Sequence, residues 1–159
     1  MIALVVRAAL GERELSSQHE RTRLAARAID IPAGWGLVDS SDEPGQVGLM
    51  HQDPRLTRLY EAPGTIDRLQ VQVQRVLDRA GVDVPTAGWT PDSIPLSPGG
   101  PAPSRSLIGA RDEVEVRVTV GNGRVDEPGL KDFTTAPGSS YVLIRLQPLS
   151  IRSHQALSR

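Results

Sequence analysis

Apolar residues recur at helical spacing in one segment of the chain. Between residues 66 and 80 they form a single stripe on one helical face, made of Ile66, Leu69, Val73, Val76, Leu77 and Ala80. Thr65 can cap the start of this helix, and Gly81 stands at its end. A second helix is predicted over residues 11–29, where apolar or small residues are interspersed with charged ones. Pro32 ends it, because proline disfavours helix in the residue before it.

Other segments alternate with the period of a strand. Valines at every second position of 114–120 are interleaved with Glu, Arg and Thr, which predicts one face in the core and one in water. Residues 141–146 (YVLIRL) are apolar on both faces near their start, so we expect an interior strand. Residues 34–40 and 55–62 are predicted to pair as a hairpin.

These elements predict an α+β fold, with an antiparallel sheet of four to five strands and two helices on one of its faces. A motif that occurs twice in the sequence supports a duplicated αββ unit. The first helix runs into Asp30–Ile31–Pro32–Ala33–Gly34–Trp35, and the second into Asp83–Val84–Pro85–Thr86–Ala87–Gly88–Trp89. If the unit is duplicated, Trp35 and Trp89 occupy equivalent places. We expect them to anchor each helix end against the sheet, in preference to stacking on a ligand.

The expected domain covers residues 11–147 as one unit. Residues 82–106 hold six Pro and three Gly, and we interpret them as a long surface loop. The tail, residues 148–159, is expected to fray.

Residues 1–10 (MIALVVRAAL) are apolar except for Arg7. They are too short for a spanning helix, which needs about 20 apolar residues. Two interpretations stay open: a first helical turn or strand packed on the domain, or the trailing end of a membrane helix.

Composition narrows the classes of function. The chain has 159 residues and a formal net charge of -1, so no strong field attracts nucleic acid. It has no Cys, which excludes disulfides, thiolate metal sites and Cys nucleophiles. Basic residues are almost all Arg, a composition associated with high-GC bacteria.

Candidate chemistry is sparse. The chain contains no G-x-S-x-G, P-loop or dinucleotide fingerprint, and we predict no cofactor. The three His residues are scattered along the sequence, and we predict no metal site. The strongest local feature is an acidic cluster around the first hairpin, formed by Asp39, Asp42, Glu43 and Asp53. It lacks the spacing of a calcium loop.

Part of the chain resembles a known group. The strings Pro32–Ala33–Gly34–Trp35, Arg58–Leu59–Tyr60–Glu61–Ala62–Pro63–Gly64 and Ala80–Gly81–Val82 are similar to segments of small actinobacterial proteins of uncharacterised function. The resemblance covers roughly residues 30–85. It implies a membrane anchor followed by an extracytoplasmic α+β domain, without an established activity.

Three functions follow as expectations. The first is a non-enzymatic binding or structural domain, extracytoplasmic and membrane-associated, that contacts a protein partner or ligand across its sheet or long loop. The second is a soluble cytoplasmic accessory subunit or homodimer that associates through an exposed edge strand, in contrast to a monomeric extracytoplasmic domain. The third is a small hydrolase or lyase that uses acidic residues near 39–53.

Overall fold

A computed structural model describes residues 2–48, 51–91 and 104–150 of the chain, without the side chains of residues 2–9. It contains two long helices and eight strands. These are α1 (Ile2–Ala28), β1 (Gly36–Glu43), β2 (Arg55–Pro63), α2 (Ile66–Arg79), β3 (Thr90–Pro91), β4 (Ser104–Arg111), β5 (Val114–Gly121), β6 (Arg124–Val125), β7 (Phe133–Thr134) and β8 (Ser139–Pro148).

The main sheet confirms the predicted α+β class. Its strand order is β1-β2-β8-β5-β4-β3, and every neighbouring pair is antiparallel. The predicted hairpin is confirmed as β1–β2, and β8 is interior as expected, between β2 and β5. The sheet has six strands, where the sequence predicted four to five.

The two extra strands, β3 and β4, overlap the segment predicted as a Pro-rich loop. That prediction was wrong for Thr90–Pro91 and from Ser104 onward, while residues 92–103 lie outside the described residues. The strand signal of β4 is weak because Gly109 stands where an apolar residue would be expected. A Cβ at Gly109 would lie 2.7 Å from Val82 Cγ1 and 2.8 Å from the Asp83 carbonyl, so this position requires glycine.

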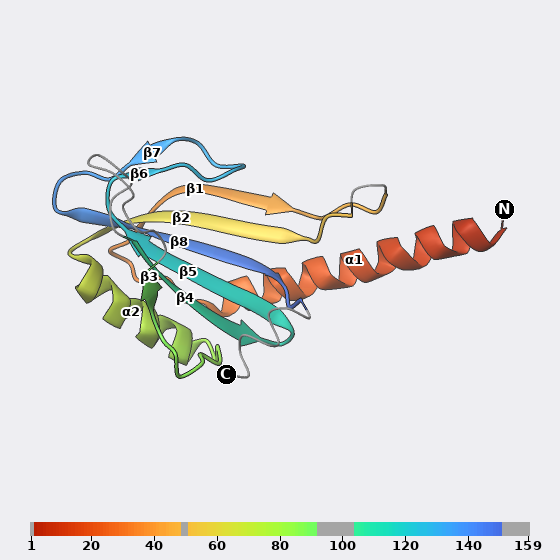
Figure 1. Cartoon of the computed structure of the whole chain (residues 1–159), viewed down its shortest axis with the longest axis horizontal. Coiled ribbons are helices and arrows are strands. Elements are labelled where there is room, and N and C mark those ends of the chain that lie inside the picture. Colours follow the sequence, from red (N-terminus) through yellow and green to blue (C-terminus); the bar gives the residue numbers. More distant parts are fainter. Residues whose placement is uncertain (1, 49–50, 92–103, 151–159) are drawn as a thin grey trace.

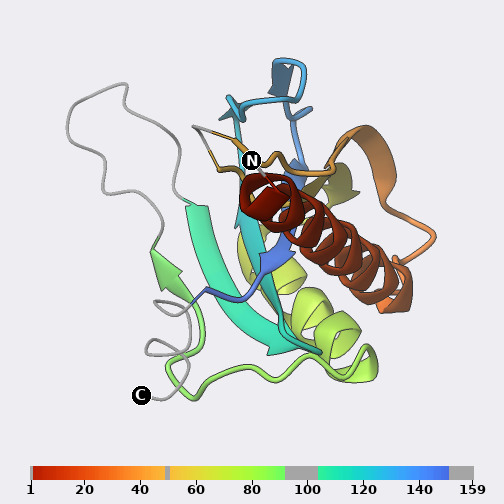
Figure 2. The same cartoon turned by 90° about the vertical axis from the view of Figure 1, so that its right-hand side faces the viewer.

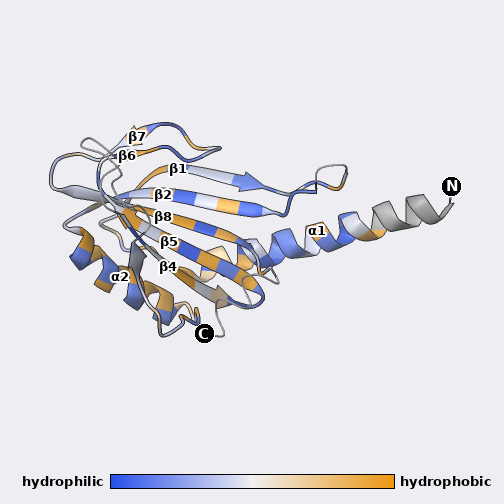
Figure 3. Ribbon diagram, viewed as in Figure 1, coloured by the Kyte–Doolittle hydropathy of each residue, from blue (hydrophilic) through white to orange (hydrophobic). Residues whose placement is uncertain are grey.

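The main core lies between the sheet and both helices, which cover the same face (Figures 1 and 2). The four valines of β5 are at most 1% exposed, and the alternate residues of β8 pack beside them. Figure 3 shows the resulting alternation of apolar and polar positions along these strands. The helices contribute mainly Ala25, Ala26, Leu69, Val73 and Leu77. Burial of each Val or Leu contributes about 1.5–3 kcal/mol.

The residues predicted to end helix α2 on either side, Thr65 and Gly81, are confirmed. The Thr65 hydroxyl accepts a hydrogen bond from the Arg68 amide at 3.4 Å, which satisfies one amide of the first turn. Gly81 follows the helix with φ +68°, the left-handed conformation that favours glycine.

Helix α1 is longer than predicted. It begins at Ile2, so residues 2–10 belong to the helix that was predicted to begin at residue 11. Its second half packs on β8, β2 and β5, with Leu15, Thr22, Ala25 and Ala26 buried. Its first half extends beyond the ends of the strands (Figure 1). None of the helices in the described part of the chain is long and apolar enough to cross a membrane.

The opposite face of the sheet is also covered, contrary to the prediction for residues 114–120. Residues 122–138, which include β6 and β7, fold back over this face and are called the flap below (Figure 1). A second apolar cluster forms there, in which Val125, Leu130 and Phe133 contact Leu59, Tyr141 and Leu143. The expected water-facing side of β5 is therefore largely buried, with Glu115 3% and Thr119 4% exposed.

The two predicted repeat units differ in their strands. Helix α1 is followed by the hairpin β1–β2, whereas α2 is followed by the short edge strand β3 and then by β4 and β5. The duplication stays a prediction.

The C-terminal tail was expected to fray from residue 148. The strand β8 includes Pro148, and the Leu149 amide donates a hydrogen bond to the Glu113 carbonyl at 2.8 Å, so the chain is still paired there. Residues 151–159 lie outside the described residues.

Candidate functional site

A groove lined by charged side chains lies on the flap face of the sheet. Its first half encloses about 300 Å³ and is lined by Arg55, Glu115, Arg117, Glu127, Pro128, Arg145 and Gln147. Its second half also encloses about 300 Å³ and is lined by Glu43, Gln52, Asp53, Arg55 and Gln147. The two halves share Arg55 and Gln147, and together they are called the charged groove below.

Two arginines stand directly opposite each other in this groove. Arg117 on β5 and Arg145 on β8 are cross-strand partners, and their side chains point to the same face. Like charges in this position destabilise a sheet. Each guanidinium is compensated by a carboxylate. Arg117 Nη2 lies 3.7 Å from Glu115 Oε1, and Arg145 Nη2 donates to Glu127 Oε2.

The carboxylates lie beneath the arginines. The side chains of Glu115 and Glu127 are 4% and 8% exposed, whereas those of Arg117 and Arg145 are 38% and 30% exposed. Gln147 also donates to Glu115 Oε1, at 3.2 Å. The Nε atoms of both arginines are buried without a hydrogen-bond partner. In this half of the groove the arginine side chains are therefore more exposed than the glutamates that pair with them.

At the boundary of the two halves, Arg55 is held by a carboxylate on the neighbouring strand. Its Nη2 atom donates to both oxygens of Glu43 at 3.2 Å, and the Ser41 hydroxyl donates to the same carboxylate at 3.3 Å. The flap approaches closely here. A Cβ on Gly129, where φ is +87°, would lie 3.1 Å from Glu43 Oε1.

The predicted acidic cluster is only partly brought together. Glu43 and Asp53 both line the second half of the charged groove. Asp53 also pairs with His51 at 3.0 Å. Asp39 accepts hydrogen bonds from the backbone amides of Lys131 at 2.8 Å and Ser40 at 2.9 Å, and these bonds lower the pKa of its carboxyl. It therefore fastens the flap to β1.

Asp42 points to the other face of the sheet, toward α1. It lies 2.5 Å from His19 Nε2 and 2.8 Å from Arg23 Nη2. Partial burial acts to raise the pKa of Asp42, but the hydrogen bonds from His19 and Arg23 outweigh it, and the pKa is lowered. Asp42 thus connects β1 to the middle of α1.

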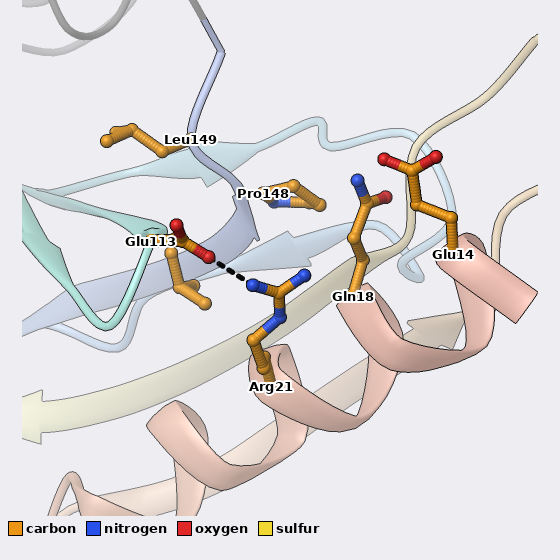
Figure 4. A pocket seen from close by; sticks show the side chains of 7 residues that line it. Glu14, Gln18, Arg21, Glu113, Pro148 and Leu149 are labelled. Atoms are coloured by element: carbon orange, nitrogen blue, oxygen red, sulfur yellow. Dashed lines mark hydrogen bonds and ion pairs between the residues drawn. The ribbon is translucent and has the colours of Figure 1, made fainter.

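A small polar pocket of about 220 Å³ lies on the other side of α1 (Figure 4). Glu14, Gln18 and Arg21 reach from the helix toward Glu113, Pro148 and Leu149, and Arg21 pairs with Glu113 in the β4–β5 turn. Asp112 and Glu113 both have positive φ, at 48° and 64°, as a two-residue hairpin turn of this type requires. Together with Asp42, Glu113 fixes α1 from both sides.

The two tryptophans lie in different environments. Trp35 is 8% exposed, its ring centroid lies 6.2 Å from that of Tyr60, and its Nε1 donates to Gln72 Oε1 at 3.3 Å. Trp89 is half-buried and lines a shallow depression with residues of α2, including Gln70, Val71 and Gln74. A packing role for both stays a prediction.

The charged groove was missed by sequence reasoning. Glu115, Arg117 and Arg145 occupy alternate positions of β5 and β8, a pattern typical of an ordinary water-facing side. The available signal was Arg145, a single charge within the otherwise apolar run Tyr141–Leu146. Among the described residues, no group of three or more His, Asp or Glu side chains could hold a metal ion.

No protein-family model matches the chain, and no curated protein matches it. One solved structure is similar, that of LpqN, involved in cell envelope biogenesis of Mycobacterium tuberculosis. The two sequences are 15% identical, and the alignment covers 82% of this chain and 74% of that one with a TM-score of 0.30. This similarity is too low to support an argument about fold or function.

Proposed function

We propose that the chain is a non-enzymatic binding domain held at a membrane on the extracytoplasmic side. The observation that carries this proposal is helix α1. Its second half is fixed on the sheet, while its first half runs beyond the sheet as one continuous helix (Figure 1).

The sequence of the extending half favours contact with lipid. Eight of the nine residues of 2–10 are apolar, with Arg7 as the exception, so no polar face is available to water. A helix that is apolar all round belongs in a protein core or a membrane, whereas pairing with one partner helix needs only an apolar stripe.

The fixed orientation of α1 also supports the proposal. His19 and Arg23 contact Asp42 on β1, and Arg21 contacts Glu113 in the β4–β5 turn, so the same helical turns are held from both sides. A helix fixed in this way sets which end of the domain faces the membrane. The charged groove lies at that end, because Glu43, Arg55 and Gln147 occur where β1 ends, β2 begins and β8 ends (Figure 1).

Vesicle flotation tests membrane association. The full chain is mixed with vesicles of phosphatidylcholine and phosphatidylglycerol, and the bound fraction is compared with that of Leu4→Glu. A charge placed in the apolar segment costs about 2.5 kcal/mol or more in lipid, so Leu4→Glu is expected to reduce binding by at least about tenfold. The matched control is Leu24→Glu on the same helix, where Leu24 is 52% exposed, and it should bind like the wild type. Equal binding of both variants would contradict the proposal, as would a wild-type chain that does not float.

A further inference from the structure

The arrangement of charges in the charged groove assigns it a class of ligand. We propose that the groove binds a small polar molecule through an oxyanion, a phosphate or carboxylate group, held between the guanidinium groups of Arg117 and Arg145. The proposal gives a ligand class to the binding domain proposed above. It depends on that proposed function in one respect, that the domain binds a small molecule.

The first support is the layering of charge. The glutamates that compensate Arg117 and Arg145 are beneath the surface, and the arginines are exposed above them. In the first half of the groove a ligand therefore meets the arginines before Glu115 and Glu127, whereas the exposed carboxylates of Glu43 and Asp53 lie in the second half. Guanidinium groups donate in a planar fork that matches the oxygens of phosphate and carboxylate groups.

The second support is preorganisation. A free arginine side chain loses rotamer entropy when it is fixed. In this groove the ion pairs with Glu115 and Glu127 already restrain both side chains. Less entropy remains to be lost when a ligand binds, and this strengthens the complex.

The third support is the placement of two like charges directly opposite each other on β5 and β8. Like charges in this position repel each other. Glu115 and Glu127 offset this repulsion from beneath the arginines, and an oxyanion between the two guanidiniums offsets it from the groove side.

The second half of the groove indicates the rest of the molecule. Gln52, Asp53, Glu43 and Gln147 line it with side chains that accept hydrogen bonds. These acceptors suit hydroxyl groups. The volumes of about 300 Å³ in each half exceed what a phosphate ion alone would fill. The ligand is therefore inferred to be a phosphorylated or carboxylated sugar or polyol.

The test is a titration of the full, isotopically labelled chain, followed by amide chemical shifts in two-dimensional NMR. Four probes are used: glucose 6-phosphate, glucuronate, inorganic phosphate and glucose, each up to about 20 mM, a range that detects weak binding. We expect saturable shifts on β5 and β8 with glucose 6-phosphate or glucuronate, and the stronger of the two identifies the oxyanion. Inorganic phosphate should bind more weakly, and glucose should not saturate. Equal binding of glucose and glucose 6-phosphate would overturn the proposal, and so would the absence of saturation with every probe.

Variants assign the binding to the groove. Arg117→Gln removes a charge-assisted contact and should weaken binding by about ten- to a hundredfold. The matched control is Arg124→Gln in the flap, because Arg124 is exposed and pairs with Asp132 outside the groove. If Arg117→Gln unfolds the chain, the double variant Arg145→Gln/Glu127→Gln removes one guanidinium without leaving a buried carboxylate unpaired, and it should show the same loss. Wild-type affinity in either folded variant would overturn the proposal. Because vesicle flotation depends on residues 2–10 and this titration does not, failure of one can be told from failure of the other.

Discussion

Arg117 on β5 and Arg145 on β8 face each other directly across the centre of the sheet, and each is compensated by a buried glutamate. A strand pair selected for stability alone would avoid two like charges at this register. The flap makes the arrangement tolerable, because it supplies Glu127 to Arg145. This pair distinguishes the flap face from the helix face, where β5 presents only valines.

Removal of a core side chain from α2 should destabilise the fold strongly. Leu69 is 0% exposed, and Leu69→Ala is expected to lower the free energy of unfolding by about 2–5 kcal/mol because it leaves a cavity. Urea unfolding followed by circular dichroism measures the change. Val71→Ala on the same helix is the control, since Val71 is 53% exposed and should change stability by less than about 0.5 kcal/mol. Equal losses would show that α2 does not pack as described.

The close approach of β4 to the segment after α2 gives a second prediction. Gly109→Ala places a Cβ 2.7 Å from Val82 Cγ1 and 2.8 Å from a backbone oxygen, so we expect a loss of about 1–3 kcal/mol. Gly34→Ala is a matched control, because a Cβ there meets nothing within 4 Å. Thermal unfolding of the two variants separates a tight contact from a general intolerance of alanine.

The predicted packing role of the two tryptophans is tested by their unequal burial. Trp35→Ala should cost about 3–5 kcal/mol, since the side chain is 8% exposed and packs on Tyr60. Trp89→Ala should cost less, because Trp89 is half-buried at the surface of α2. Denaturant unfolding followed by circular dichroism measures both. A larger loss for Trp89 would reverse the assignment.

The contact between α1 and β1 should depend on pH. The folded-state pKa of Asp42 is lowered, so its charged carboxylate, which accepts hydrogen bonds from His19 and Arg23, stabilises the fold above its unfolded pKa of about 3.9. That contribution is lost as the pH falls through the lower, folded-state pKa. We expect Asp42→Asn to be less stable than the wild type at pH 7, and the difference to be smaller at pH 3 and to vanish once the pH is below the folded-state pKa. A difference that stays constant between these two pH values would show that the charge of Asp42 is not what stabilises the contact.

Much of the fold was predictable because local patterns and packing agree. The helical stripe of 66–80 and the alternating valines of β5 each bury one face, and periodicity reports burial. The strand β4 could not be predicted in the same way, because Gly109 interrupts its apolar face to admit Val82. The charged groove was hidden for another reason. Charged residues on alternate strand positions indicate water, and only the folded-back flap shows that Glu115 is buried.

The acidic cluster illustrates what sequence proximity leaves open. Asp42 and Glu43 are neighbours in the chain, yet adjacent residues of a strand point to opposite faces. Asp42 therefore contacts α1, while Glu43 contacts Arg55 in the charged groove. The predicted strand ended at residue 40, so this alternation was not applied to Asp42 and Glu43, whereas β1 continues to Glu43.

Spin labelling tests the membrane placement of α1 most directly. The chain has no Cys, so a single label can be introduced by Leu4→Cys, with Leu24→Cys as the control. In the presence of phosphatidylcholine and phosphatidylglycerol vesicles, electron paramagnetic resonance measures the collision of each label with oxygen, which concentrates in lipid, and with a water-soluble nickel complex. The account predicts that the label at position 4 collides mainly with oxygen and the label at position 24 mainly with nickel. Equal exposure of both labels to the nickel complex would contradict it.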